Sequence, residues 1–581
     1  MTQYHGTTAT TRRRLANRWR AWLLSLDGSP ARITELPGPR SIGSLVIGQH
    51  MLDGQFRFAG RHVTARGASV WDIRAPDDAF FVDMHSCVWL DHMAALATKQ
   101  AADVARSWVL QWVRLFGRGH GLAWSAELVG QRQIRFLHHY DDLARDMAEA
   151  EIVRIASLLR RQGKFLARRW KLTPEGTPRL DAIAAAILSA RCVEGVSVDL
   201  HALSRGVQRE VTRLLDAHGG LASRNPEELL RLLSLMIWIR DDLEVLGQTI
   251  PQTLSDNIAL VAPMLRGIRH SDGGLARMQG GGAGVNSGLD QALAASGTRD
   301  IRRDGGMGYA RMASGRTSVL IDAAVPARGD ESYEAHASSL AFEVTSGRRP
   351  LIVSCGAGGP FGPDWQKAGR ATPSHSVMGL DGYSSSRLGR TRDILGQPRE
   401  QMDQRPSEIE HHLERHLDYL RFEASHDGYL RSHGLLQGRA LELTIDGSAV
   451  AGEEVLLSEG RRARAKFDKL VDGAKQGVPF TIRFHLHPDV LAEYDLELNA
   501  YRMTLQNGEV WIFRHDGACE MALESSVYLA SEALKPTATK QVVLTSRALA
   551  YATRIRWSLS KTPESLKGIR DVAQQQAELT D

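Results

Sequence analysis

The chain has 581 residues, of which 43% are hydrophobic and 24% are charged, values normal for a folded soluble protein. This length exceeds what one hydrophobic core supports, so two or three domains are expected. The net charge of +5 fits attraction to an acidic polysaccharide, but solubility alone explains it equally well. The charge lies far below that of a strongly basic nucleic-acid-binding domain, and no such module is recognisable, so nucleic acid is not an expected partner.

The cysteines and the N-terminus bear on the cellular compartment. The four cysteines form no CxxC pair and predict reduced thiols rather than a disulfide framework. No apolar run approaches the roughly 20 residues of a membrane helix, so no membrane span is expected. The segment TTRRRLANRWRAWLLSLDG is basic and then only briefly apolar, which argues against a signal peptide. The cytoplasm is therefore the expected location, with the periplasm or cell envelope as the alternative.

Helical periodicity dominates the first half of the chain. Residues 1–65 are expected to be an irregular N-terminal segment with room for one hairpin, because glycines interrupt SIGSLVIGQHMLDGQFRFAGRHV. Residues 66–272 carry apolar side chains at three- and four-residue spacing, as in WLDHMAALATKQAADVARSWVLQWVRLF and PEELLRLLSLMIWIRDDLEVLGQ. Asn225 is expected to cap the second of these helices, with Pro226 at its first position. Successive helices of similar length predict helical hairpins packed in an array or ring.

A glycine-rich linker, residues 273–300, is expected between the two halves. Its segment GGLARMQGGGAGVNSGLDQAL is typical of a flexible connector or a long functional loop. A phosphate-binding loop is the alternative, but it requires a preceding strand and, in its P-loop form, a GK[ST] triplet that is absent here.

The period changes to two after about Arg303, which predicts an antiparallel β-sandwich over residues 301–560. Short apolar runs such as TSVLIDAAV, PLIVSC, RALELTID and TKQVVLTS lie between Gly, Asp, Asn and Pro turns. The polar residues 561–581 are expected to form a loose C-terminal tail. The expected fold class is therefore α+β, with a helical domain followed by a β-sandwich.

Histidines concentrate in the strand region. RFHLHP places His485 and His487 on one face of a regular strand, where two imidazoles either share a metal or hydrogen-bond on a polar face. ASHDGYLRSHG places His426, Asp427 and Tyr429 in one turn. Such a turn suits an acid–base group, or else Asp427 caps its own backbone.

Several ordered segments give the C-terminal half a resemblance to a known family. They are AHASSLAFEVTSGRRPLIVSCG, HSVMGLDGYSSSR, ASHDGYLRSHGLLQGRALELTIDG and FTIRFHLHPDV, and GYARMASGRTSVLIDAAV and HSDGGLARM fit the same pattern. Over about residues 270–555 the chain resembles the heparinase II/III-like polysaccharide lyases. This resemblance implies an N-terminal incomplete (α/α) toroid of helical hairpins and a C-terminal antiparallel β-sandwich.

The resemblance also implies β-elimination of a uronic-acid polysaccharide in the cleft between the two domains. A base removes the proton at C5, the carboxylate charge is neutralised, and an acid assists the departing glycosidic oxygen. In this family Tyr and His side chains usually do this work. The catalytic candidates are therefore Glu334, His336, Tyr383, His426 and Tyr429, and the substrate-binding candidates are Arg370 and Arg387.

A metal site is implied as well, but it is incomplete in this chain. The family's H-x-H-x-D-x-x-S-F-E strand reads EAHASSLAFE here, so its second histidine is His336 while its first is replaced by Glu334. The histidine of a later strand is His375, but Ser354 holds the metal-binding aspartate position. The candidate cofactor is zinc, held by His336, His375 and the Ser354 position. Cys355 is a neighbouring thiol, although a regular strand points it to the face opposite Ser354.

Two functions stay open. The first is a lyase that cleaves an acidic glycan. The second is a diverged member that binds a polysaccharide or cell-envelope polymer without cleaving it, which the replacements at Glu334 and Ser354 favour. The helical half offers no matching catalytic motif, and its RRQGKFLARRW stretch either binds carboxylates or forms a solvated face. Neither reading fixes the oligomeric state.

Overall fold

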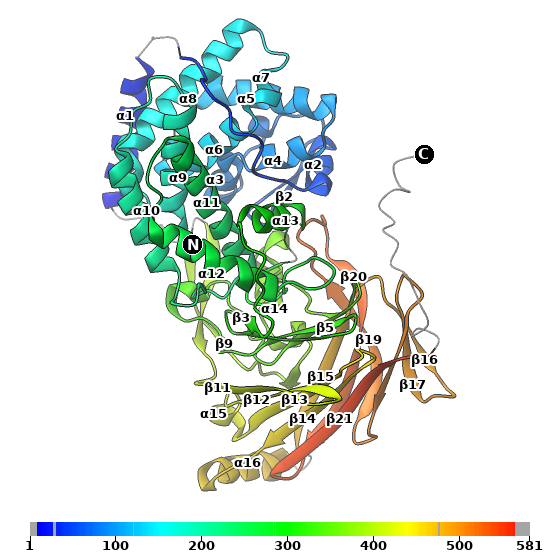
Figure 1. The fold of residues 1–581 in the computed structure, drawn as a ribbon. Coiled ribbons are helices and arrows are strands. Elements are labelled where there is room, and N and C mark those ends of the chain that lie inside the picture. The colour runs from blue at the N-terminus through cyan, green and yellow to red at the C-terminus, as the bar shows by residue number, and fades with distance from the viewer. Residues whose placement is uncertain are drawn as a thin grey trace.

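The computed structural model describes residues 8–26, 31–119, 121–282, 284, 286–394, 396–474 and 477–563. Helices fill the first half of the chain and antiparallel strands fill most of the second, as Figure 1 shows. The expected α+β organisation is therefore confirmed. Most of the tail expected over residues 561–581 lies outside the described residues. Within the described residues, no helix combines the length and apolarity needed to cross a membrane.

The first half and the junction contain thirteen α-helices among the described residues. They are α1 (Thr8–Ser25), α2 (Leu45–Leu52), α3 (Asp78–Ser86), α4 (Trp89–Ala95), α5 (Lys99–Phe116), α6 (Ala126–His138), α7 (Tyr140–Ala144), α8 (Glu149–Arg169), α9 (Thr177–Cys192), α10 (Leu200–Leu214), α11 (Pro226–Val245), α12 (Gln252–Gly267) and α13 (Asn286–Ala295). Three further helices, α14 (Pro363–Gly369), α15 (Leu430–His433) and α16 (Arg461–Ala474), lie among the strands.

Helix α9 lies at the centre of the helical domain. It contacts α6, α8, α10 and α11, and its alanine-rich sequence is buried over most of its circumference, as expected for a helix that is apolar on all sides. Gly130 of α6 permits close packing here, because a Cβ at that position would lie 3.0 Å from the backbone of Ala182. Small side chains thus bring α6 and α9 close together.

Helix α11 begins as the sequence predicts. The Asn225 side-chain oxygen accepts hydrogen bonds from the backbone N–H groups of Glu227 at 2.9 Å and Glu228 at 3.3 Å, and Pro226 takes the first helical position. This cap fixes where the helix starts, and therefore which of its side chains face inward.

The N-terminal segment is more regular than its glycines indicate. It contains the expected hairpin, β1 (Gln55–Phe58) paired with β2 (Arg61–Thr64), but also the helices α1 and α2. Gly48 does not break α2, because it is the contact point with α4. A Cβ at Gly48 would lie 2.3 Å from the carbonyl oxygen of His92.

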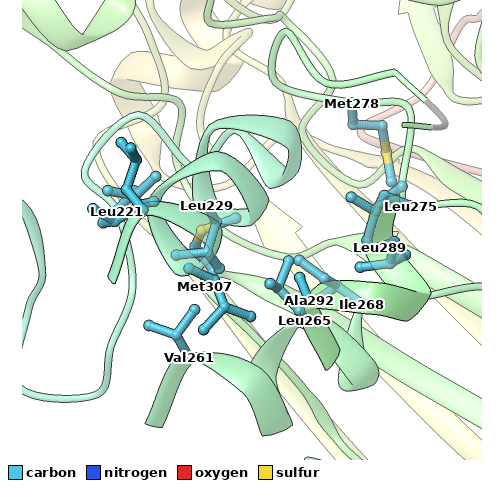
Figure 2. Close-up of a cluster of buried hydrophobic side chains, with 14 of the residues drawn as sticks. Leu221, Leu229, Val261, Leu265, Ile268, Leu275, Met278, Leu289, Ala292 and Met307 are labelled. Atoms are coloured by element: carbon cyan, nitrogen blue, oxygen red, sulfur yellow. The ribbon is translucent and has the colours of Figure 1, made fainter. Parts of the chain in front are cut away.

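The glycine-rich stretch expected over residues 273–300 contains helix α13. Part of that stretch, residues 283 and 285, lies outside the described residues. Figure 2 shows the apolar cluster that α13 joins through Leu289 and Ala292, with Leu265 and Ile268 from the end of α12 and Leu275 from the segment that follows. The helix is therefore packed against the junction between the two halves of the chain.

The second half contains two antiparallel sheets and a separate hairpin. The strands are β3 (Gly305–Gly306), β4 (Tyr309–Ser314), β5 (Thr317–Asp322), β6 (Phe342–Ser346), β7 (Arg349–Val353), β8 (Met378–Leu380), β9 (Arg387–Ile394), β10 (Gln397–Gln404), β11 (Ile409–Arg415), β12 (Tyr419–His426), β13 (Leu436–Thr444), β14 (Ala449–Leu457), β15 (Val478–Leu486), β16 (Leu491–Asp495), β17 (Ala500–Thr504), β18 (Val510–His515), β19 (Glu520–Tyr528), β20 (Thr537–Ala548) and β21 (Ala552–Lys561). One sheet has the order β11-β12-β13-β14-β21-β18-β17-β16. The other has the order β19-β20-β15-β7-β6-β5-β4-β3, with β8 beside β15.

Aromatic side chains join the two sheets into a sandwich. Trp557 of β21 lies 5.5 Å from the ring of Phe342 on β6 and 4.8 Å from that of Phe484 on β15. Gly452 on β14 makes room for the indole, because a Cβ there would lie 2.2 Å from it. The alternating inward positions of both sheets thus form one core, as expected for a sandwich.

Candidate functional site

Glu334, one of the catalytic candidates, is held in an ion pair. Its carboxylate accepts hydrogen bonds from Gln366 Nε2 at 2.7 Å and from Arg399 Nη1 of β10 at 2.9 Å. The glycine-rich segment passes directly over it, because a Cβ at Gly280 would lie 2.7 Å from the Glu334 Cβ. The side chain is half-buried, and both carboxylate oxygens already have donors.

His336 and His375 lie together, as the sequence predicts, but both are closed off from solvent. Their ring centroids are 5.1 Å apart, and the exposed fractions of the two residues are 1% and 0%. Ser354 Oγ lies 3.1 Å from His375 Nδ1. Both nitrogens of His336 and Nε2 of His375 have no hydrogen-bond partner in the part of the chain that the structure describes. Burial lowers the pKa of both, to about 4 for His375, so each ring is neutral at neutral pH.

The residues around this pair do not form a zinc site. Among the described residues, no group of three His, Cys, Asp or Glu side chains is placed to hold a metal. Ser354 contributes a hydroxyl where a carboxylate would be needed, and hydroxyl is a poor zinc ligand. Cys355 turns toward His485, with Sγ 3.6 Å from Nδ1, and burial raises the pKa of this thiol to about 11. The available donors near His336 are thus two imidazoles and one hydroxyl.

The other histidine and tyrosine candidates occupy two different environments. The ring centroids of His426 and Tyr429 lie 5.8 Å apart, and both residues are buried. This burial lowers the pKa of His426 to about 4 and raises the pKa of Tyr429. Tyr383 is 39% exposed, and its ring lies 4.4 Å from the guanidinium of Arg387. Of these groups, Tyr383 and Arg387 alone are solvent-accessible.

Arg370 uses its guanidinium to hold local backbone. It donates to the carbonyl oxygens of Ala335, Glu400 and Ser332, each at 2.8 Å. The residue is 3% exposed. Its contacts therefore position the loop that carries Glu334 and His336, and its role toward a substrate stays a prediction.

His485 and His487 do not share a ligand. His485 bonds to Ser526 Oγ at 2.7 Å and to the Pro373 carbonyl at 2.9 Å. The His487 ring instead lies 4.9 Å from that of Tyr528. These contacts favour the hydrogen-bonded reading of RFHLHP over the metal-binding one.

A cavity of about 300 Å³ lies inside the helical domain, next to the glycine-rich segment. One stripe of α11 lines it with Glu227, Arg231, Ser234, Trp238 and Asp241. These residues are spaced four, three, four and three apart, so they share one face of the helix. The remaining wall comes from the 40–42 segment, α4, α6, α9 and α13. We call this space the α11 cavity.

The side chain of Asp91 in the wall of the α11 cavity is tightly held. Asp91 accepts from Ser41 Oγ at 2.7 Å and pairs with Arg135 at 3.2 Å and His139 at 2.8 Å. Burial alone would raise the pKa of Asp91, but Arg135 and His139 outweigh it and hold that pKa below its ordinary value. Asp91 is therefore a fixed negative charge.

Asp181 is less fully satisfied than Asp91, and Glu227 is held by backbone groups. Asp181 Oδ2 accepts from Gln131 Nε2 at 3.1 Å and pairs with Arg231, whereas its buried Oδ1 has no hydrogen-bond partner among the described residues. Glu227 accepts the backbone N–H of Gly284 at 3.1 Å, and burial raises its pKa. The cavity thus offers hydrogen-bond acceptors beside the indole of Trp238.

A family model matches the second half of the chain. Residues 297–558 match the family model described as heparinase II/III-like, C-terminal. The second half of this chain is a heparinase II/III-like domain. The match spans the β-sandwich from just after α13 to β21, so the resemblance seen in the sequence is confirmed.

Similar proteins extend the likeness over both halves. FtsZ-localized protein C of Caulobacter vibrioides (strain NA1000 / CB15N) is 26% identical over 501 residues, which cover 84% of this chain and 83% of that protein. The crystal structure of heparinase III aligns with a TM-score of 0.60 at 11% identity, covering 95% of this chain and 90% of that one. Heparan sulfate lyase HepC from Pedobacter heparinus aligns with a TM-score of 0.51 at 12% identity, covering 97% and 89%. The chain therefore shares the fold of these lyase structures over both of its halves.

The stripe on α11 was missed by sequence reasoning. Its helix was recognised in PEELLRLLSLMIWIRDD, but a Glu, Arg, Ser, Trp and Asp at helical spacing are also what a solvated face contains. Trp238 was the available signal, because a tryptophan among polar residues of one helix face often marks a binding surface.

The buried histidines of the heparinase-like domain predict a pH dependence of stability. The unfolded chain protonates its histidines below about pH 6.5, whereas the folded pKa of His375 is about 4. The unfolded state therefore binds more protons in this window, and the free energy of unfolding falls as the pH drops through it. We expect each such histidine to contribute a slope of up to about 1.4 kcal/mol per pH unit.

Urea unfolding of the wild type and of His375→Asn between pH 4 and 7 measures this slope. In His375→Asn, the free energy of unfolding should fall less steeply as the pH drops. His412→Asn, at an exposed position on β11, is the matched control and should keep the wild-type slope. Identical slopes for all three proteins would contradict the prediction.

Proposed function

We propose that this chain binds a glycan in the α11 cavity and does not cleave it by the β-elimination of its family. One observation carries the proposal. At the position of the family's first histidine stands Glu334, held by Arg399 and Gln366, and the neighbouring His336 and His375 have no solvent access. A proton at C5 of a sugar cannot be removed by groups that the sugar cannot reach.

The α11 cavity supports the binding part of the proposal. Its walls combine the indole of Trp238 with hydrogen-bonding side chains. An apolar ring flanked by a few placed polar groups is the usual composition of a small-molecule or sugar site. The cavity also lies near the junction between the domains, because the glycine-rich segment beside it passes over Glu334.

A lyase acting on an acidic glycan is the second candidate. It is favoured by the lyase fold and by Tyr383, which is exposed beside Arg387 and so combines an acid–base group with a cation. In that case the tyrosine would act as base and acid, and Arg387 would bind the uronate carboxylate.

The cellular setting is part of the proposal. All four cysteines, each within the described residues, are free thiols, which supports a reducing compartment such as the cytoplasm over the periplasm. The name of FtsZ-localized protein C links that relative to FtsZ. We include localisation with FtsZ, and a cell-envelope glycan as the ligand, as proposals for this chain.

Calorimetric titration with a panel of oligosaccharides, combined with ultraviolet absorbance of the same samples, tests the proposal. We expect measurable binding without the absorbance of an unsaturated uronate product. Trp238→Ala should weaken binding roughly tenfold through loss of the stacking face. Trp22→Ala, at an exposed tryptophan of α1 outside the cavity, is the matched control and should bind as the wild type does.

The outcomes separate the candidates. A rise in absorbance with uronate polymers would overturn the non-cleaving proposal and establish the lyase, and loss of that rise in Tyr383→Phe would identify its base. Absence of binding to every glycan, or equal binding by Trp238→Ala, would remove the α11 cavity from consideration.

A further inference from the structure

The charges that line the α11 cavity do not suit an anionic ligand. The lining contains three arginines, Arg40, Arg135 and Arg231, against the four carboxylates Asp91, Asp181, Glu227 and Asp241, a formal balance of −1. Lyases of acidic glycans need the opposite balance, because a uronate carboxylate or a sulfate must be neutralised where it binds.

Each lining arginine is already paired. Arg135 lies 3.2 Å from Asp91, Arg231 pairs with Asp181, and Arg40 lies 3.0 Å from Asp242 behind the wall. A ligand anion would have to draw an arginine away from its partner. Asp91 and Asp181 are 5% and 1% exposed, so such an exchange would take the arginine partner away from a buried carboxylate, which is unfavourable.

The groups that are free to bind are acceptors. Asp181 is 99% buried on the cavity wall and keeps one oxygen without a donor among the described residues, whereas the Glu227 carboxylate accepts from the backbone N–H groups of Gly282 and Gly284. Sugar hydroxyls and amide N–H groups supply donors, and the Trp238 indole offers a face on which the C–H groups of a pyranose stack. Leu230 and Ala292 complete an apolar side of the cavity.

We propose that the α11 cavity selects a sugar residue that carries no negative charge, and discriminates against uronate and sulfated sugars. This inference rests on the proposed function, of which it specifies the ligand class. Glu227 is the residue that sets the selectivity, because its carboxylate accepts from a ligand hydroxyl or amide and repels a ligand anion. The cavity volume of about 300 Å³ limits the bound part to a short segment of a chain.

Glu227→Gln gives a test whose sign depends on the ligand. Glutamine keeps the oxygen that accepts the Gly284 N–H, so the local backbone contact can persist. For an uncharged or N-acetylated oligosaccharide, we expect binding about fivefold weaker, because a charge-assisted hydrogen bond becomes a neutral one. For a uronate oligosaccharide the same variant should bind more tightly than the wild type, because the repulsion is removed.

Titration of four oligosaccharides of equal length, neutral, N-acetylated, sulfated and uronate, measures these affinities in the wild type and in the variant. Glu244→Gln, at an exposed position of the same helix that does not line the cavity, is the control and should leave all four affinities unchanged. Thermal unfolding of each variant verifies that it is folded.

Two results together support the inference. The wild type binds the neutral and N-acetylated sugars more tightly than the charged ones, and Glu227→Gln weakens the binding of the former and strengthens the binding of the uronate sugar. Stronger binding of the uronate or the sulfated sugar overturns it and leaves the proposed glycan binding intact. Failure of all four to bind overturns the proposed function itself, so the two failures are distinguishable.

Discussion

Replacing Arg224 by alanine is expected to lower the free energy of unfolding by about 3–5 kcal/mol. This arginine precedes α11 and reaches across to the start of the β-sandwich. Its guanidinium donates to Asp322 Oδ1 at 2.5 Å and to the carbonyl oxygens of Met307 at 3.1 Å, Gly308 at 2.7 Å and Ala324 at 2.8 Å. With the carbonyl oxygen of Val325 at 3.2 Å, this one side chain donates to five acceptors on the other half of the chain.

The cost arises mainly from the groups that Arg224 leaves behind. Asp322 has no solvent exposure, and its other oxygen already accepts from Gln279 at 2.7 Å and Ser338 at 2.6 Å. Without the arginine, the charge on Asp322 would be buried and uncompensated. Asp322→Asn removes that charge, so the double variant should lose less stability than the two single losses added together.

Urea unfolding monitored by tryptophan fluorescence measures the effect. Arg240→Ala on α11 is the matched control, because its partner Asp241 is partly exposed, and such a pair contributes about 1 kcal/mol or less. Because Arg224 links the helical half to the sandwich, its variant should also separate one unfolding transition into two. A loss no larger than that of Arg240→Ala would show that the junction does not depend on Arg224.

The architecture could be predicted from the sequence, because the spacing of apolar residues reflects which side chains are buried in helices and strands. The runs TSVLIDAAV, PLIVSC and TKQVVLTS became β5, β7 and β20, and the caps of α11 lie where Asn225 and Pro226 indicated. Helix α13 was not expected, since its surrounding glycines are typical of a linker, and its packing against α11 and the end of α12 stabilises it. Local propensity cannot report such a tertiary contact.

The sequence predicted that His336 and His375 lie together, but it did not predict that both are buried. His336 precedes β6 and His375 precedes β8, so two loops that enter the same sheet bring the rings together, and the motif order carries that information. Their burial depends on the loops that Arg370 and Arg399 hold in place, through contacts 30 or more residues away in sequence. The α11 cavity depends on helices closing around one face of α11, which the helix's own sequence does not reveal.

Replacing Arg439 by methionine is expected to have an effect of similar size, about 3–5 kcal/mol, inside the sandwich. Arg439 on β13 and Glu454 on β14 are both fully buried, and Nε donates to the carboxylate at 2.8 Å. Burial raises the pKa of Glu454 despite this partner, which shows how strongly the site disfavours a lone charge. Arg439 also donates to the carbonyl oxygens of Leu340 at 2.5 Å and Ser376 at 3.0 Å.

Loss of Arg439 should also disturb the candidate site. Its two carbonyl partners belong to Ser376, which adjoins His375, and to Leu340, which follows the loop that carries His336. The single variant should therefore lose stability and also open the histidine pair to solvent, which diethyl pyrocarbonate modification of imidazoles would detect. The double variant Arg439→Met with Glu454→Leu removes both charges, and an apolar pair of similar volume should recover most of the lost stability. If the double variant were no more stable than Arg439→Met, the unpaired charge of Glu454 would not be the cause of the loss. The loss would then come from the two backbone carbonyls that Arg439 no longer contacts. The main role of Arg439 would in that case be to position the histidine loops.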